Sequence, residues 1–173
     1  MFIDGIGRFT AQDARDEAEW ARLAAFCERQ GLSAFSRDPF IGGHVTGSAF
    51  VLSEDGRAVL LTHHAKLDRW LQLGGHCDGL ADVRFTALKE AYEESGLSRI
   101  ALLSDDVFDV DIHPIPARGT EPEHLHYDVR FLMRAEAGAL RVSGESEALA
   151  WVPLANLEEY TTEASVLRMR NRL

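Results

Sequence analysis

The sequence has few cysteines, no long hydrophobic run and no excess of basic residues. Its two cysteines, Cys27 and Cys77, are too few for a disulfide framework. No apolar run reaches the roughly 18 residues that a membrane span needs, and no basic segment followed by an apolar one opens the chain. The formal net charge of -10 disfavours nucleic acid and anionic membranes as partners. We therefore expect a cytoplasmic protein that binds neither a nucleic acid polymer nor a membrane.

The composition suits one folded unit of 173 residues, with 46% hydrophobic and 27% charged residues. We expect an N-terminal helical extension over residues 1–43 and the main domain over residues 44–173. Apolar residues recur at helical spacing over residues 12–30, and Gly31 is a suitable stop for that helix. We expect the helix to pack on the domain. An arm that joins a homodimer, or a lid over the substrate, is the alternative.

The rest of the pattern combines strands and helices. Alternation of apolar and polar residues, with turn residues between the runs, predicts seven strands, at 44–52, 58–62, 71–73, 101–103, 107–112, 124–133 and 148–152. Pro114 and Pro116 are expected to end the fifth of these strands. Residues 154–160 and 165–173 are expected to be helical. The pattern therefore predicts an α/β (α+β) fold.

A glycine-rich loop followed by an acidic helix dominates the middle of the sequence, over residues 74–97. Gly96 offers a left-handed C-cap for the helix. Glu90, Glu93 and Glu94 stand at i, i+3 and i+4, so their carboxylates project from one helical face. Because like charges at this spacing repel, we expect a hard divalent cation to hold them, and magnesium prefers such oxygen ligands. A solvated acidic face without a metal is the structural alternative.

These residues resemble the Nudix box. The family pattern is Gly, five residues, Glu, seven residues, then Arg-Glu-aliphatic-x-Glu-Glu-x-Gly-aliphatic, and residues 75–97 match it without a gap. Ala81 stands where the family has glutamate, and Lys89 where it has arginine. In the family these two side chains brace the loop against the helix. Asp82, about two turns before Lys89, is expected to supply a weaker pairing, which predicts a looser brace and a working metal site.

The resemblance extends over about residues 45–160 and implies a Nudix fold, in which helices sandwich a mixed β-sheet. It implies hydrolysis of a nucleoside diphosphate linked to another moiety, with Mg²⁺ or Mn²⁺ as cofactor and a small nucleotide-type molecule as substrate. It also implies four metal ligands, namely Glu90, Glu93, Glu94 and the Gly75 carbonyl.

The resemblance implies catalytic roles for glutamates as well. Glu90 matches a position that serves as metal ligand in some members and as general base in others, and Glu94 belongs to the metal-binding pair. A further base or ligand often comes from the loop before the tryptophan strand. Glu145, six residues before Trp151, is the best match, with Glu147 next. A surface glutamate without a role is the alternative for both.

Basic and imidazole side chains are the candidate contacts to the substrate: His76, Lys66, Arg69 and His126. His76 follows the glycines directly, which places it beside the predicted metal site. His124 and His126 alternate on one strand face with Asp128, which favours a metal or substrate surface there. A hydrogen-bonded structural role is the commoner one for a single histidine. Cys77 has no visible partner for nucleophilic catalysis and is interpreted as structural.

Two other functions stay open. Ala81 and Lys89 motivate a non-catalytic Nudix-like module, which would bind a nucleotide without turnover. The run Gly75-His76-Cys77 suggests an isomerase, because isopentenyl diphosphate isomerases share the fold and use Cys, His and Glu with metal. The intact glutamates favour the hydrolase. Selectivity is expected from loops outside the box, above all from residues 117–123 and the N-terminal helix.

Overall fold

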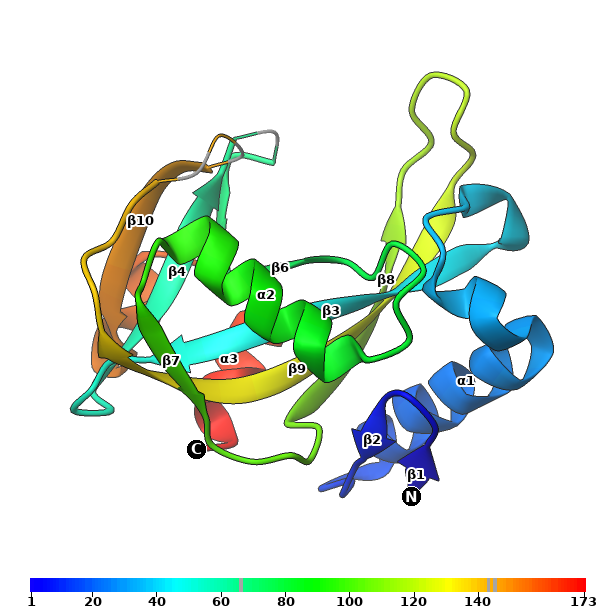
Figure 1. Ribbon diagram of the computed structural model, residues 1–173, viewed down its shortest axis with the longest axis horizontal. Coiled ribbons are helices and arrows are strands. Elements are labelled where there is room, and N and C mark those ends of the chain that lie inside the picture. The colour runs from blue at the N-terminus through cyan, green and yellow to red at the C-terminus, as the bar shows by residue number, and fades with distance from the viewer. Residues whose placement is uncertain (66, 143, 145) are drawn as a thin grey trace.

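The computed structural model describes residues 1–65, 67–142, 144 and 146–173 (Figure 1). The helices are α1 (Ala14–Gln30), α2 (Val83–Ser95) and α3 (Ala164–Asn171), with 3₁₀ segments η1 (Gly31–Phe35), η2 (Pro39–Ile41) and η3 (Leu154–Glu159). The strands are β1 (Phe2–Ile3), β2 (Gly7–Arg8), β3 (Gly43–Leu52), β4 (Ala58–His64), β5 (Arg69–Leu71), β6 (Leu73–His76), β7 (Arg99–Leu102), β8 (Asp109–Ile115), β9 (His124–Ala137) and β10 (Ser146–Pro153). None of the helices in these ranges is long and apolar enough to cross a membrane.

The main sheet is mixed. Its strand order is β10-β4-β3-β9-β7, and β5, β6 and β8 pair with β4, β3 and β9 respectively. Strands β3 and β9 are parallel and paired along the whole of β3, whereas the other pairs are antiparallel. Figure 1 shows α2 crossing in front of the sheet and α3 behind it. The predicted α+β class, with helices on both sides of a mixed sheet, is confirmed.

Helix α2 lies directly on β3 because the contact point has no side chain. A Cβ on Gly47 would lie 2.8 Å from the Val83 carbonyl oxygen and 3.0 Å from the Ala87 nitrogen. The helix starts at Asp82, whose side chain accepts a hydrogen bond from the Phe85 amide at 3.0 Å. It ends, as predicted, at Gly96, which adopts the left-handed conformation with φ of 70°. The glutamate-bearing helix is therefore fixed at both ends and along its length.

Helix α1 packs on the sheet, as expected for residues 12–30. Its side chains Trp20, Leu23 and Phe26 are buried. The Phe26 ring stacks on Tyr127 of β9 with the ring centroids 4.1 Å apart, and Trp20 contacts Phe9 at 5.2 Å. The N-terminal segment thus shares one hydrophobic core with the sheet. The division of the chain at residues 43 and 44 stays a prediction.

The glycine-rich segment differs from the prediction. Gly74, Gly75 and His76 belong to strand β6, which pairs with β3, and the predicted strand at 71–73 spans the end of β5 and the start of β6. A Cβ on Gly74 would lie 2.2 Å from the Ser48 Oγ, so the two strands approach too closely for a side chain. Glycines carry no alternation of apolar and polar side chains, which is why the sequence pattern indicated a loop.

The strand predicted to end at Pro114 and Pro116 continues through Pro114, so the prediction was wrong for that proline, and it ends directly before Pro116. Strand β8 continues through Pro114 to Ile115 and pairs with β9 along its length. Among the strands of the described ranges, β8 has β9 as its one partner, so it forms an edge. Proline is tolerated on an edge strand because its missing N–H removes no bond to a second neighbour.

Candidate active site

Two of the predicted metal-binding glutamates contact strand β6 where α2 passes it. A Cβ on Gly75 would lie 2.6 Å from the Glu90 Cδ and 2.7 Å from its Oε2, so the carboxylate rests on the bare backbone of that glycine. The Gly74 amide donates a hydrogen bond to the Glu94 Oε2 at 2.9 Å. The structure therefore places Glu90 against Gly75 and Glu94 against the Gly74 amide, on adjacent residues of β6.

Lys89 joins two of the glutamates. Its Nζ lies 2.8 Å from the Glu90 Oε1 and 3.1 Å from the Glu93 Oε2. The hydrogen bond to Glu90 raises the pKa of Lys89 above its ordinary value, with Glu93 adding to the effect. The predicted pairing of Lys89 with Asp82 was wrong, because Asp82 caps α2 and Lys89 bridges the carboxylates. Lys89 lies one turn from Glu93 but about two turns from Asp82, so its ammonium group pairs more easily with Glu93.

The loop that leads into α2 is supported by the N-terminal hairpin. A Cβ on Gly5 would lie 2.5 Å from the Ala81 carbonyl oxygen, and the Val83 amide donates to the Gly5 carbonyl at 3.1 Å. Ala81 occupies the position at which the Nudix box has its bracing glutamate. Backbone contact with the β1–β2 turn thus stands where the family has a side-chain pair.

The donor set of this site fits a hard divalent cation. Glu90, Glu93 and Glu94 offer carboxylate oxygens, and the backbone of Gly75 lies against Glu90. Magnesium and manganese favour such oxygen ligands over nitrogen or sulfur. The Lys89 ammonium between two of the carboxylates shows that positive charge is already accommodated there. These residues can hold Mg²⁺ or Mn²⁺.

The other predicted site residues are distributed differently. Arg69, at the start of β5, forms an ion pair with Glu163, the residue before α3, at 2.8 Å. Glu147 lies 3.1 Å from the Nδ1 of His63. Lys66 and Glu145 lie outside the described residues. To contact a substrate, as predicted, Arg69 would therefore have to do so while paired with Glu163 or break that ion pair first.

His76 and His126 lie on the sheet face opposite α2. The strand register pairs His44 with His126, His113 with His126, and Thr46 with His76. Paired residues point to the same side of a sheet, and Gly47, between Thr46 and Ser48, faces α2. We call the five histidines gathered on the opposite face the histidine cluster: His44, His76, His113, His124 and His126. Within it the ring centroids of neighbouring members lie between 4.6 and 5.6 Å apart.

Burial keeps two members of the cluster neutral. Desolvation, with a further contribution from the neighbouring histidines, lowers the pKa of His44 to about 4 and that of His126 to about 2. At neutral pH each ring therefore offers a lone pair and an N–H and no positive charge. A contact of His126 with phosphate would rest on hydrogen bonding alone.

The same face carries a second polar group further along β9, which we call the ion-pair cluster: Asp109, Asp111, Asp128, Arg130 and Arg168. Arg130 is 1% exposed, and its Nε lies 2.7 Å from the Asp128 Oδ2. Its Nη1 lies 3.1 Å from the Asp109 Oδ2. Arg168 of α3 reaches the same Asp109 oxygen at 2.7 Å. These contacts attach α3 to the sheet.

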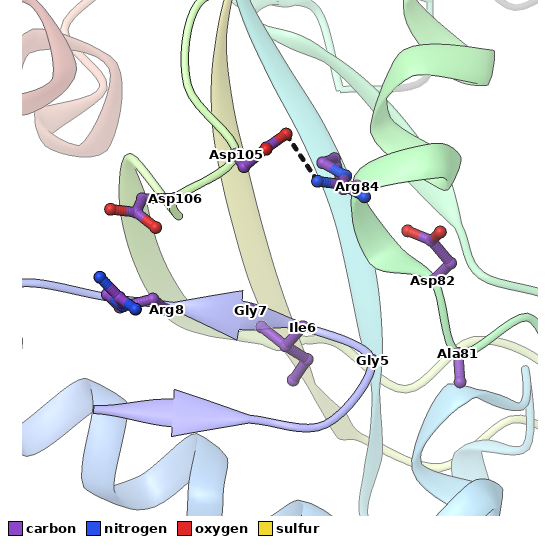
Figure 2. A pocket seen from close by; sticks show the side chains of 9 residues that line it. All are labelled: Gly5, Ile6, Gly7, Arg8, Ala81, Asp82, Arg84, Asp105 and Asp106. Carbon is purple, nitrogen blue, oxygen red and sulfur yellow. Dashed lines mark hydrogen bonds and ion pairs between the residues drawn. The ribbon is translucent and has the colours of Figure 1, made fainter.

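A hollow of about 380 Å³ lies between the β1–β2 hairpin, the first turn of α2 and the β7–β8 connection (Figure 2). Arg84 and Asp105 form an ion pair at 2.6 Å across it. Asp82, on its rim, lies about 12 Å along the helix axis from Glu90. The hollow is therefore separate from the glutamates.

Sequence interpretation missed His44 and His113. His44 opens a predicted strand, and alternation alone places it on one face with Thr46 and Ser48. The position of that face beside His126 depends on the parallel pairing of β3 with β9, which no local pattern indicates.

Comparisons with known proteins bear on this arrangement. The family model described as NUDIX domain matches residues 43–170. A MutT NUDIX hydrolase from Burkholderia pseudomallei is similar in structure at 26% identity, with a TM-score of 0.56, over 76% of this chain and 98% of that one. A C. elegans Ap4A hydrolase in a binary complex is similar at 16% identity and a TM-score of 0.60, over 74% and 93%.

A further similar structure is the NUDIX domain of Shewanella oneidensis NrtR complexed with ADP ribose, at 18% identity and a TM-score of 0.52, over 74% of this chain and 84% of that one. None of the curated proteins matches the chain. The matches confirm the resemblance that residues 75–97 carry.

Proposed function

Because the chain belongs to the Nudix family, we propose that it is a metal-dependent hydrolase of a nucleoside diphosphate linked to another moiety. One observation carries the proposal: Glu90 of α2 packs closely against Gly75 of β6, where no Cβ intervenes, and Glu94 accepts a hydrogen bond from the Gly74 amide. The carboxylates are thus positioned by the backbone and do not form a loose acidic surface.

In this mechanism Glu90, Glu93, Glu94 and the Gly75 carbonyl would hold Mg²⁺ or Mn²⁺. When bound there, the cation would neutralise phosphoryl oxygens and lower the pKa of water. The Gly74 amide orients Glu94 through its Oε2, and Lys89 orients Glu90 through its Oε1. One glutamate of the catalytic set, Glu90, Glu94 or Glu145, accepts a proton from the attacking water. The water oxygen then bonds to phosphorus, and a phosphorus–oxygen bond of the diphosphate breaks.

The substrate we propose is a small nucleotide-type molecule. Similar structures include an Ap4A hydrolase and a domain complexed with ADP ribose, which supports this class without selecting a member of it. The predicted substrate contacts are His76, Lys66, Arg69 and His126. His76 follows Gly75 directly in β6, so the two residues point to opposite faces of the sheet, with Gly75 toward Glu90 and His76 toward the histidine cluster.

The structure does not favour the isomerase alternative. Cys77 is buried, and burial raises the pKa of its thiol to about 12, so it is protonated at neutral pH. A thiol in that state is a poor acid or nucleophile. The structural interpretation of Cys77 agrees with its position in the hydrophobic core.

The proposal is tested by turnover of a panel of nucleoside diphosphate derivatives with Mg²⁺, Mn²⁺ or chelator, measured as formation of the nucleoside monophosphate. Glu94→Gln should keep the fold and lower metal-dependent turnover by on the order of a thousandfold, because a charged ligand is lost. Glu28→Gln, at an exposed position of α1, is the matched control and should keep full activity.

Turnover of Glu94→Gln near that of the wild type would contradict the proposal. If nucleotides raise the thermal midpoint of the wild type and none is turned over, the protein is the non-catalytic binding module. Ala81 and Lys89 would then be the first residues to change.

A further inference from the structure

Among the described residues, the buried side chain of His44 has no hydrogen-bond partner. Its side chain lies at the start of β3, and the residue is 2% exposed. In the described part of the chain, neither its Nδ1 nor its Nε2 has a hydrogen-bond partner, and both atoms are buried. Nearly all buried polar groups in proteins are paired, so an imidazole with both nitrogens unpaired indicates a missing ligand.

Two further histidines converge on the same place. His44, His124 and His126 each offer one ring nitrogen, and these three atoms lie within 4.8 Å of one another. A tetrahedral zinc ion, bound at 2.0–2.1 Å, separates its nitrogen ligands by about 3.4 Å. Small side-chain rotations therefore suffice to bring the three rings onto one ion.

The tautomer of His124 suits ligation. Its Nδ1 lies 3.0 Å from the Pro122 carbonyl oxygen. A carbonyl oxygen only accepts, so Nδ1 carries the proton and Nε2 keeps its lone pair. Metal-binding histidines usually donate their second nitrogen in this way, which fixes the orientation of the ring.

We propose that His44, His124 and His126 form a transition-metal site of the Zn²⁺ class. Three imidazoles without a carboxylate favour zinc and its neighbours over magnesium, which prefers oxygen. Three protein ligands leave a fourth position open. The ring of His76 lies beside the site, with its centroid 5.0 Å from that of His44 and 5.3 Å from that of His126. A water molecule or a phosphate oxygen fits that position.

The proposed site is distinct from the glutamate site. The histidines lie on the sheet face away from α2, whereas Gly75 faces Glu90 on α2. Strand β6 passes between the two sites, with Gly75 at one and His76 beside the other. The proposal therefore stands whether or not the glutamates support hydrolysis.

The test uses untagged protein, stripped with chelator and then titrated with Zn²⁺ or Co²⁺ in excess Mg²⁺, which saturates the carboxylates. We expect one tightly bound equivalent and the visible absorption of a tetrahedral, nitrogen-ligated Co²⁺. His124→Gln and His126→Gln should each weaken binding by at least about 100-fold, because each removes a ligand.

Two controls locate the ion. His63→Gln should bind as the wild type does, although His63 lies near Asp68 and Glu147 in a second, exposed group of candidate ligands. Glu94→Gln should also retain the bound equivalent. Binding that His63→Gln or Glu94→Gln abolishes, and that His126→Gln leaves unchanged, overturns the proposal.

The wild type provides a measurement that needs no variant. One equivalent of Zn²⁺ should raise its thermal midpoint, and chelator should reverse the rise, because a ligand that binds the folded state stabilises it. Stripped wild-type protein that neither binds Zn²⁺ nor changes its midpoint would also overturn the proposal.

Discussion

On strand β9 a row of polar residues on one face runs from His124 to Arg130, and its two ends carry buried groups of different kinds. At the Arg130 end, Arg130 is enclosed by Asp128 and Asp109, and every charge has an opposite charge within hydrogen-bond distance. At the start of the strand, His126 and His124 surround His44, which has no hydrogen-bond partner among the described residues. Arg130 and His44 are both buried, but of the two only Arg130 has hydrogen-bond partners among the described residues. Paired groups hold the fold together, and the unpaired group indicates a ligand.

Breaking the paired end should have the largest effect. Arg130→Met keeps the volume and leaves Asp109 and Asp128 buried with less positive charge, so we expect a loss of about 3–5 kcal/mol in the free energy of unfolding. Urea denaturation measures it, and Arg57→Met, at an exposed position in the β3–β4 turn, should stay within about 0.5 kcal/mol of the wild type. A loss below about 1 kcal/mol for Arg130→Met would show that this cluster does not stabilise the fold.

An intermediate effect should depend on pH. Burial alone would raise the pKa of Asp111, but hydrogen bonds from His113 and Arg168 and the charge of Arg130 hold it well below its ordinary value of 3.8. The stabilisation is therefore complete above about pH 4 and is lost as the pH falls toward the lower folded-state pKa.

Asp111→Asn should therefore be less stable than the wild type at pH 7 by about 2 kcal/mol, and the difference should shrink below pH 4. Denaturation curves between pH 2 and pH 7 measure both variants. A difference that is constant over this range would refute the assigned role of the Asp111 charge.

The smallest effect should come from the unpaired end. In chelator-treated protein, His44→Leu removes two nitrogens that have no hydrogen-bond partner, so the free energy of unfolding should change by less than about 1 kcal/mol in either direction. With one equivalent of Zn²⁺ the wild type should become the more stable of the two. A metal-free loss as large as that of Arg130→Met would remove the distinction between the two ends.

The sequence predicts the glutamate site better than the fold around it. Glu90 and Glu94 follow from a contiguous motif on one helix, whose first turn is capped by Asp82 and whose last turn ends at Gly96. Such signals are local, so they survive without knowledge of the partner strands. The contacts of Lys89 were predicted wrongly, because several carboxylates within its reach compete for one ammonium group.

The histidine cluster required information that lies far apart in the chain. His44 and His126 become neighbours only through parallel pairing of strands whose residues are separated by the whole of α2. Strand β6 was hidden for a different reason, since Gly74 and Gly75 leave no side-chain pattern. Likewise, Pro114 indicates the end of a strand only if that strand is central, and here β8 is an edge strand.

The contact between Gly5 and Ala81 changes how the limits of the protein should be drawn. The family match begins at residue 43, so a fragment cut there would contain every glutamate of the site. It would lack the Gly5 carbonyl that receives the Val83 amide, and with it the hairpin that takes the place of the missing glutamate–arginine brace. The family match covers residues 43–170, whereas the contacts that support the glutamate site also include Gly5, which lies outside that match.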